Sequence, residues 1–231
     1  MRSDIEARLS LLGALRLAGF RADGVRFFDN DVARTRRSFR QVLPMMLMGF
    51  IALALLRPIS IDSGEDASRW VMAFTATNAE RGSDLGYWIV MNMAAQIVKW
   101  AGFLVLAYEL MKVMGHGQHI HRFIQIFNWM LVVRMTAILA PLLLTVIGLI
   151  TLTSAHMTVI AISWLLITYQ FFAYRVALNI PWHLTLSLVM IETIMSVFIG
   201  GITLGILHAG AVDQATLQSE VTLTAPSGSS P

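Results

Sequence analysis

The sequence predicts an all-α integral membrane protein, with five transmembrane helices and an N-terminal amphipathic helix at the membrane interface. Composition is the first reason: 56% of the 231 residues are hydrophobic and 13% are charged, against about a quarter charged in a typical soluble domain. The second is five apolar runs, each near the roughly 17–25 residues that cross a bilayer. The third is an uneven distribution of Lys and Arg around these runs.

The N-terminal segment, residues 1–40, is predicted to be cytoplasmic and rich in arginine. A helix is expected over residues 3–20, because apolar side chains recur there at nearly helical spacing. These side chains are Ile5, Leu9, Leu12, Leu15 and Leu17. Such a helix would lie on the membrane surface with its arginines near anionic headgroups. The alternative is an ordinary soluble amphipathic helix packed under the bundle.

Residues 41–207 form the predicted transmembrane domain. The five spans are expected at about 41–57, 86–109, 123–150, 156–178 and 183–207. The loop after the first span includes a possible short surface helix at 67–82. The polar tail, 208–231, is predicted to be disordered.

The distribution of basic residues predicts the orientation. The first 40 residues hold nine arginines, and the loops expected on the same side bring Lys and Arg there to twelve, against three on the other side. The positive-inside rule therefore places the N-terminus in the cytoplasm and the C-terminus outside. The same distribution favours membrane topology over nucleic-acid binding, despite a net charge of +3. With no cysteine, the chain has no disulfide or thiolate metal site.

The second and fifth predicted spans each carry a polar stripe on one face. The stripes are Asn92, Gln96 and Lys99 on one helix, and Thr185, Glu192, Ser196 and Thr203 on the other. Lys99 and Glu192 each lie nine residues, roughly 14 Å, from the cytoplasmic end of their spans. A buried charge needs a partner, so we predict an ion pair between Lys99 and Glu192. A polar contact between Gln96 and Ser196 is expected to flank it.

Arg134 in the third span is expected at a similar depth and competes for Glu192. One acid facing two bases leaves a surplus positive charge. One interpretation is a proton or ion relay, or an anion site. The other is an ion pair that only fixes helix register, and we favour it because the polar residues form no continuous path.

Two further groups are weaker candidates. His116, His119 and His121 could bind a metal, but few carboxylates lie nearby in the sequence, and a solvated turn is the favoured interpretation. Gly201 and Gly205 form a G-x-x-x-G pattern, which lets another helix approach closely. No catalytic motif is found, so neither enzymatic activity nor a cofactor is expected.

Three stretches together resemble a family of uncharacterised bacterial inner-membrane proteins, broadly similar to the five-span Yip-type membrane proteins. They are FFDNDVARTRRSFR before the first span, FNW in the third, and YRVALNIPWHLTLSLVMIETIMSVFIGGI across the fifth. The resemblance implies a five-helix layout and the bacterial inner membrane, and it carries no catalytic residue.

Two functions are therefore considered. The first is a non-enzymatic scaffold or assembly protein that contacts the lipid bilayer, anionic headgroups, and a second copy or other membrane subunits. The alternative is a small transporter or permease component that uses Lys99, Arg134 and Glu192. A membrane enzyme ranks third.

Overall fold

The computed structural model describes residues 2–62 and 85–224, and within these ranges the chain is helical with no strand. The predicted surface helix at 67–82 lies outside them. The elements are α1 (Arg2–Ala18), η1 (Ala22–Phe27), α2 (Val32–Asp62), α4 (Leu85–Val113), η2 (Gly117–His119), α5 (Ile120–Val146), α6 (Leu152–Leu178) and α7 (Trp182–Thr224). The all-α class predicted from the sequence is confirmed for the described residues.

Four described helices are long and apolar enough to cross a membrane. The spans are Ile89–Val113, Gly117–Val146, Thr153–Leu178 and Trp182–Thr203. The predicted first span, 41–57, falls inside α2, which is not among the four. The predicted first span is continuous with the end of the Arg-rich segment, because α2 already begins at Val32. The proposed boundary at residue 40 therefore lies within one continuous helix.

Local chemistry explains where several helices begin and end. The Asp31 carboxylate accepts hydrogen bonds from the backbone N–H groups of Ala33 and Arg34 at the start of α2, as an N-cap does. The Thr151 hydroxyl accepts from the backbone N–H of Ser154 in the same way at α6. Asn179 ends α6 in the left-handed conformation, with φ 53°, and α7 begins just after Pro181.

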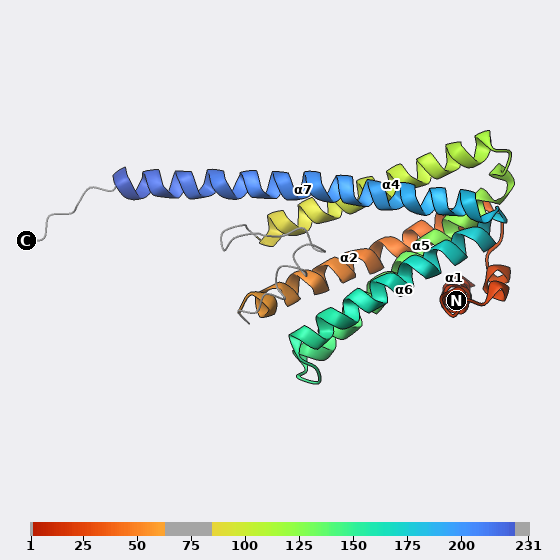
Figure 1. Ribbon diagram of the computed structural model, residues 1–231, viewed down its shortest axis with the longest axis horizontal. Coiled ribbons are helices and arrows are strands. Elements are labelled where there is room, and N and C mark those ends of the chain that lie inside the picture. The colour runs from red at the N-terminus through yellow and green to blue at the C-terminus, as the bar shows by residue number, and fades with distance from the viewer. Residues whose placement is uncertain (1, 63–84, 225–231) are drawn as a thin grey trace, which may run out of the picture.

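The helix α5 lies at the centre of the bundle and packs against α2 on one side and α6 on the other. Figure 1 shows α4 and α7 crossing one face of this group, and the two helices also pack against each other. A cluster of aromatic rings joins α4, α5 and α6. Its members are Phe103, Phe123, Phe127 and Tyr174, with ring centroids 5.0–6.4 Å apart.

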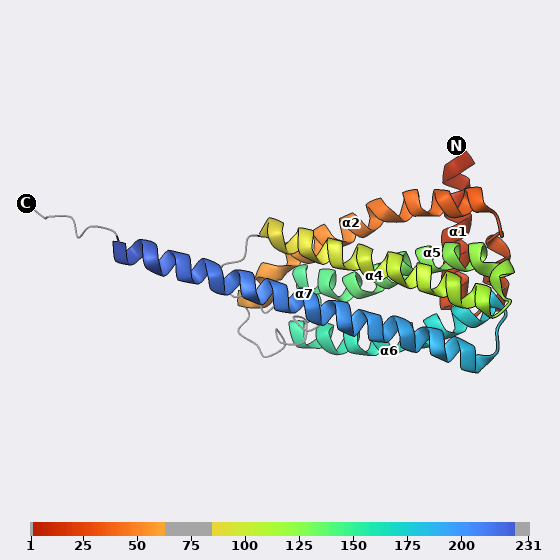
Figure 2. The same ribbon diagram turned by 90° about the horizontal axis from the view of Figure 1, so that it is seen from above.

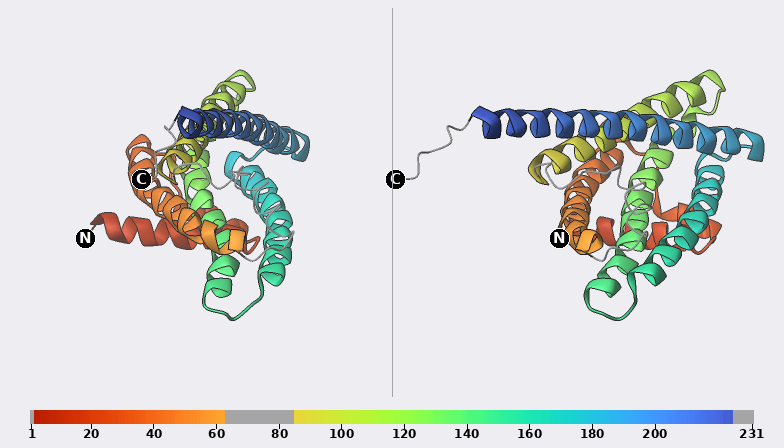
Figure 3. Two further views of the ribbon diagram at one scale, coloured as in Figure 1. Left: turned by 90° about the vertical axis from the view of Figure 1, so that its left-hand side faces the viewer. Right: turned by 60° about the vertical axis from the view of Figure 1, so that its left-hand side comes forward.

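The short helix α1 lies crosswise against α5 and α6 near one end of the bundle, which we call the α1 end (Figure 2). The left view of Figure 3 shows the same crossing from the end of the bundle opposite α1. The Tyr169 hydroxyl of α6 donates to the backbone carbonyl of Ala14, 3.2 Å away. On its other side α1 packs tightly on η1, because a Cβ built on Gly24 would lie 2.6 Å from the carbonyl oxygen of Gly13.

The helix α1 has apolar side chains on two faces. Ile5, Leu9, Leu12 and Leu15 are each 42–54% exposed. On the other face Ala14 and Leu17 are fully buried, and Leu11 packs against the core. The helix therefore packs on the bundle and also leaves a row of apolar side chains exposed.

The helix α7 continues past the predicted end of its span and through much of the predicted disordered tail. It runs unbroken to Thr224 and extends well beyond the other helices (Figure 1). Its 43 residues correspond to roughly 65 Å of helix. The sequence explains the continuation, because residues 211–224 contain no glycine or proline and the next proline is at 226. Residues 225–231 lie outside the described part of the chain.

Candidate functional site

The acid at the centre of the bundle is Glu192 on α7, whose side chain is almost completely buried. The Arg134 guanidinium of α5 donates to Glu192 Oε1 at 3.0 Å. This ion pair joins two helices that are distant in the sequence. It compensates a carboxylate that would otherwise be costly to bury.

Two side chains of α6 complete the surroundings of the carboxylate. The Gln170 amide and the Tyr174 hydroxyl both donate to Glu192 Oε2. The Gln170 carbonyl oxygen in turn accepts from Arg134 at 3.4 Å. We call Arg134, Gln170, Tyr174 and Glu192 the Glu192 cluster. Both carboxylate oxygens are occupied, and three helices are tied together at one point.

The predicted ion pair between Lys99 and Glu192 is not formed. Both residues are described, and no ion pair joins them; the partner of Glu192 is Arg134. Lys99 on α4 is half-buried, and its ammonium group lies within electrostatic range of both Arg134 and Glu192. Arg134 takes the acid because its long planar side chain can contact the carboxylate and Gln170 together.

The predicted contact between Gln96 and Ser196 is also absent. Both are described and half-buried, and no hydrogen bond joins them. Their helices nevertheless pack together, since a Cβ built on Gly102 would lie 3.1 Å from Met195 Cε. Asn92 is half-buried on α4. Matching depths therefore identified two packed helices, but not the side-chain pairs between them.

A second polar network joins α4, α5 and α2 nearer the α1 end. The Trp100 indole N–H donates to Asn128 Oδ1 at 3.1 Å, and the Asn128 amide donates to the Ser38 hydroxyl at 2.9 Å. One turn away, Gln125 donates to the Asp29 carbonyl oxygen at 2.7 Å. The sequence places Gln125 and Asn128 on other faces of their helix than Arg134, and the structure shows that those faces bind α2.

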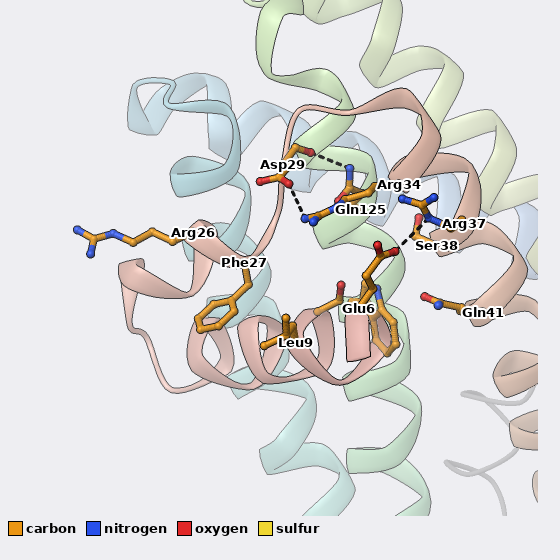
Figure 4. Close-up of a pocket in the computed structure, with 12 residues that line it drawn as sticks. Glu6, Leu9, Arg26, Phe27, Asp29, Arg34, Arg37, Ser38, Gln41 and Gln125 are labelled. Carbon is orange, nitrogen blue, oxygen red and sulfur yellow. Dashed lines mark hydrogen bonds and ion pairs between the residues drawn. The ribbon is translucent and has the colours of Figure 1, made fainter. Parts of the chain in front are cut away.

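A cavity of about 300 Å³ opens where α1, η1, α2 and α5 meet. Two ion pairs line it: Arg37 with Glu6 at 3.1 Å, and Arg34 with Asp29 at 2.5 Å. Figure 4 shows both arginines beside the cavity, whereas the Arg26 side chain points away from them. The sequence singled out the Arg-rich segment but gave no indication that it closes over a hollow.

The remaining candidates are not brought together into a site. Among the described residues, no group of three His, Asp or Glu side chains could hold a metal ion, so His116, His119 and His121 form none. Gly201 and Gly205 have open space within the described chain where a Cβ would be added. Among the described elements, no helix therefore packs on the G-x-x-x-G pattern.

The comparisons with known proteins give no family. The chain matches no family model, no curated protein and no solved structure. The function is therefore argued from the geometry.

Sequence reasoning missed Gln170 and Tyr174 as partners of Glu192. They are four residues apart on α6, a spacing that places both on one helical face, and this was the available signal. Tyr169 and Tyr174 are both buried, and their hydroxyl groups donate hydrogen bonds inside the protein.

Proposed function

We propose that this chain is a non-enzymatic scaffold or assembly protein of the bacterial inner membrane. The observation that carries the proposal is the closed bonding of the Glu192 cluster. Arg134, Gln170 and Tyr174 occupy both carboxylate oxygens, so the acid presents neither a reactive group nor an open ligand site. Such a cluster suits a role in fixing the register of three helices.

The outward face of α1 supports attachment to the cytoplasmic leaflet. Tyr169, which bonds to α1, lies nine residues before Leu178 at the end of α6, or roughly 14 Å along the helix. That depth is suitable for a helix whose apolar face enters the boundary between headgroups and acyl chains. Ile5 and Leu12 would contact lipid, and the basic side chains of the segment would contact anionic headgroups.

In this proposal α2 supplies a fifth span. Its apolar part exposes large side chains such as Met48, at 71%, and Ile51, as expected for a surface that contacts lipid. Five crossings, with the arginines in the cytoplasm, would place the C-terminus outside. This layout agrees with the one that the resemblance to Yip-type membrane proteins implies.

The partner surface in this proposal is one face of α7. Gly201 and Gly205 lie on the same side of the helix as the exposed Ile194 and Val197, and opposite Glu192. Small residues in such a face allow close contact with a second copy or with another membrane subunit.

Cross-linking in the native membrane tests this surface. A photoreactive side chain at Val197 should cross-link to a defined protein or to a second copy. Gly201→Leu with Gly205→Leu should abolish the product and leave the thermal stability of the purified protein unchanged. Ala161→Leu, at an exposed position on α6, is the control and should retain the product. An unchanged cross-link in the double variant would contradict the assignment of the surface.

The alternative function is a small transporter component, and the observation that favours it is the position of Lys99. Its ammonium group adds a second positive charge beside the Glu192 cluster. Proteoliposomes containing the purified protein distinguish the two functions. The scaffold proposal expects proton and anion fluxes equal to those of empty liposomes, whereas a flux lost in Lys99→Met would favour transport.

A further inference from the structure

The cavity at the α1 end has a polar part and an apolar part. Arg34 and Arg37 contribute exposed polar groups, and Leu9 and Phe27 contribute apolar surface. Gln125 and Trp129 of α5 also line the cavity but are 3% and 1% exposed. On α5, Gln125 is five residues and Trp129 nine residues from Ile120, or roughly 8 Å and 14 Å along the helix. The lining of this helix therefore changes from polar to apolar with increasing depth in the bundle.

Within the described residues, each of the two arginines contacts a single acid and has further N–H donors to offer. Arg34 meets Asp29 through Nη1, and Arg37 meets Glu6 through Nε. A guanidinium has five N–H donors, and within the described chain no other acceptor contacts either side chain. The side chains of Arg34 and Arg37 are 37% and 44% exposed, so a ligand that enters the cavity can reach both of them. The free donors therefore suit an anion with several oxygens, which planar guanidinium groups bind well.

The N-terminal segment as a whole is also positively charged. Residues 1–40 contain nine arginines and five acidic residues. The excess positive charge attracts anionic lipids of the cytoplasmic leaflet. The outward leucines of α1 would hold the cavity at the depth where phosphate groups give way to acyl chains.

We propose that this cavity binds the phosphate headgroup of an anionic phospholipid, an inference that rests on the proposed placement of α1 at the membrane. Arg34 and Arg37 contact the phosphate oxygens, and Leu9 and Phe27 contact the first carbons of an acyl chain. The lipid thereby joins α1 and η1 to α2. A soluble phosphate compound would meet the same arginines, but it would leave the apolar surface without a partner.

Lipid binding to the full-length protein in neutral detergent tests the proposal. Short-chain phosphatidylglycerol should bind at a single saturable site by titration calorimetry, and phosphatidylcholine should not compete. Arg34→Gln with Arg37→Gln should weaken phosphatidylglycerol binding at least about tenfold, because two charge-assisted contacts are lost. Arg36→Gln with Arg40→Gln is the matched control: both residues are exposed on α2 and outside the cavity lining. It should change the affinity less than about threefold.

A second variant keeps all the charges and removes the space. Ser10 lines the cavity, so Ser10→Trp should also weaken phosphatidylglycerol binding at least about tenfold, because the bulky indole occupies the volume. This variant decides the question if the double arginine variant does not fold. Unchanged binding in Ser10→Trp would overturn the proposal.

Two further results would overturn the lipid assignment. Equal losses in the two double arginine variants would indicate diffuse surface attraction rather than a site. Glycerol phosphate or inorganic phosphate binding as tightly as phosphatidylglycerol would identify a soluble ligand. Neither result affects the scaffold proposal, which is tested by cross-linking at α7 and by ion flux.

Discussion

The Arg134 guanidinium on α5 donates to Glu192 Oε1 on α7 across 3.0 Å, although the two residues are 58 positions apart in the chain. Lys99 on α4 lies within electrostatic range of both but forms no ion pair with Glu192. Glu192 therefore pairs with one of the two basic residues near it, and the two should differ in their contribution to stability.

Arg134→Met should destabilise the protein strongly, whereas Lys99→Met should have a small effect. Removing Arg134 leaves a buried carboxylate without its counterion, and breaking a buried ion pair costs about 3–5 kcal/mol. Lys99→Met removes a charge that repels Arg134. Unfolding in mixed micelles, followed by circular dichroism, measures both free energies. An equal loss in both variants would show that Lys99 shares Glu192.

The double variant Arg134→Met with Glu192→Gln should recover part of the stability lost in Arg134→Met. The uncompensated carboxylate is then replaced by a neutral amide, which still accepts hydrogen bonds from Gln170 or Tyr174. The same unfolding measurement yields the coupling energy of the pair. Strictly additive losses would contradict a direct interaction between the two side chains.

Asn128→Leu should cost about 1–3 kcal/mol, because the Trp100 indole N–H loses its acceptor and Ser38 loses a donor inside the bundle. Ser163→Ala is a suitable control, since that hydroxyl bonds only to the backbone of its own helix. Free energies of unfolding compare the two. Equal effects would show that the network linking α2, α4 and α5 contributes nothing beyond helix propensity.

Gly24→Val should displace η1 from α1. A Cβ at this position would lie 2.6 Å from the backbone carbonyl oxygen of Gly13, and backbone atoms cannot move aside cheaply. Overpacking of this kind costs about 1–3 kcal/mol. Gly205→Ala, where the space is open, should be neutral. Hydrogen exchange of the α1 amides should rise in the first variant only, and unchanged protection there would argue against this packing.

Cysteine labelling tests whether α2 crosses the membrane. The chain has no native cysteine, so Ala22→Cys and Ser229→Cys can each be labelled alone in intact cells. Five crossings place these positions in opposite compartments, because the number of crossings is odd. Only Ser229→Cys should then react with an impermeant reagent. Labelling of both positions, or of neither, would place them in the same compartment and would contradict a crossing by α2.

Several features were predictable because they depend on local sequence. The apolar runs from 86 to 207 became the four long apolar helices, since length and hydropathy suffice to recognise such segments. Glu192 and Arg134 were expected in one charged layer because charges are rare in such runs, but the partner predicted for Glu192 was Lys99, and the structure pairs it with Arg134. Hydrogen-bond partners of Glu192 such as Gln170 were not recognised from the sequence, because neutral polar residues are less conspicuous than charges in an apolar run.

The sequence by itself determined the helical membrane class, the stretches that become long apolar helices, and the residues whose burial demands a partner. These follow from the cost of placing polar groups in hydrocarbon, which acts on each segment separately. Tertiary structure alone decided that Glu192 meets Arg134 rather than Lys99, and that α1 closes over an arginine-lined cavity. Those outcomes depend on helix rotation, crossing and side-chain reach, and neighbouring residues along one helix do not specify how another helix will meet them.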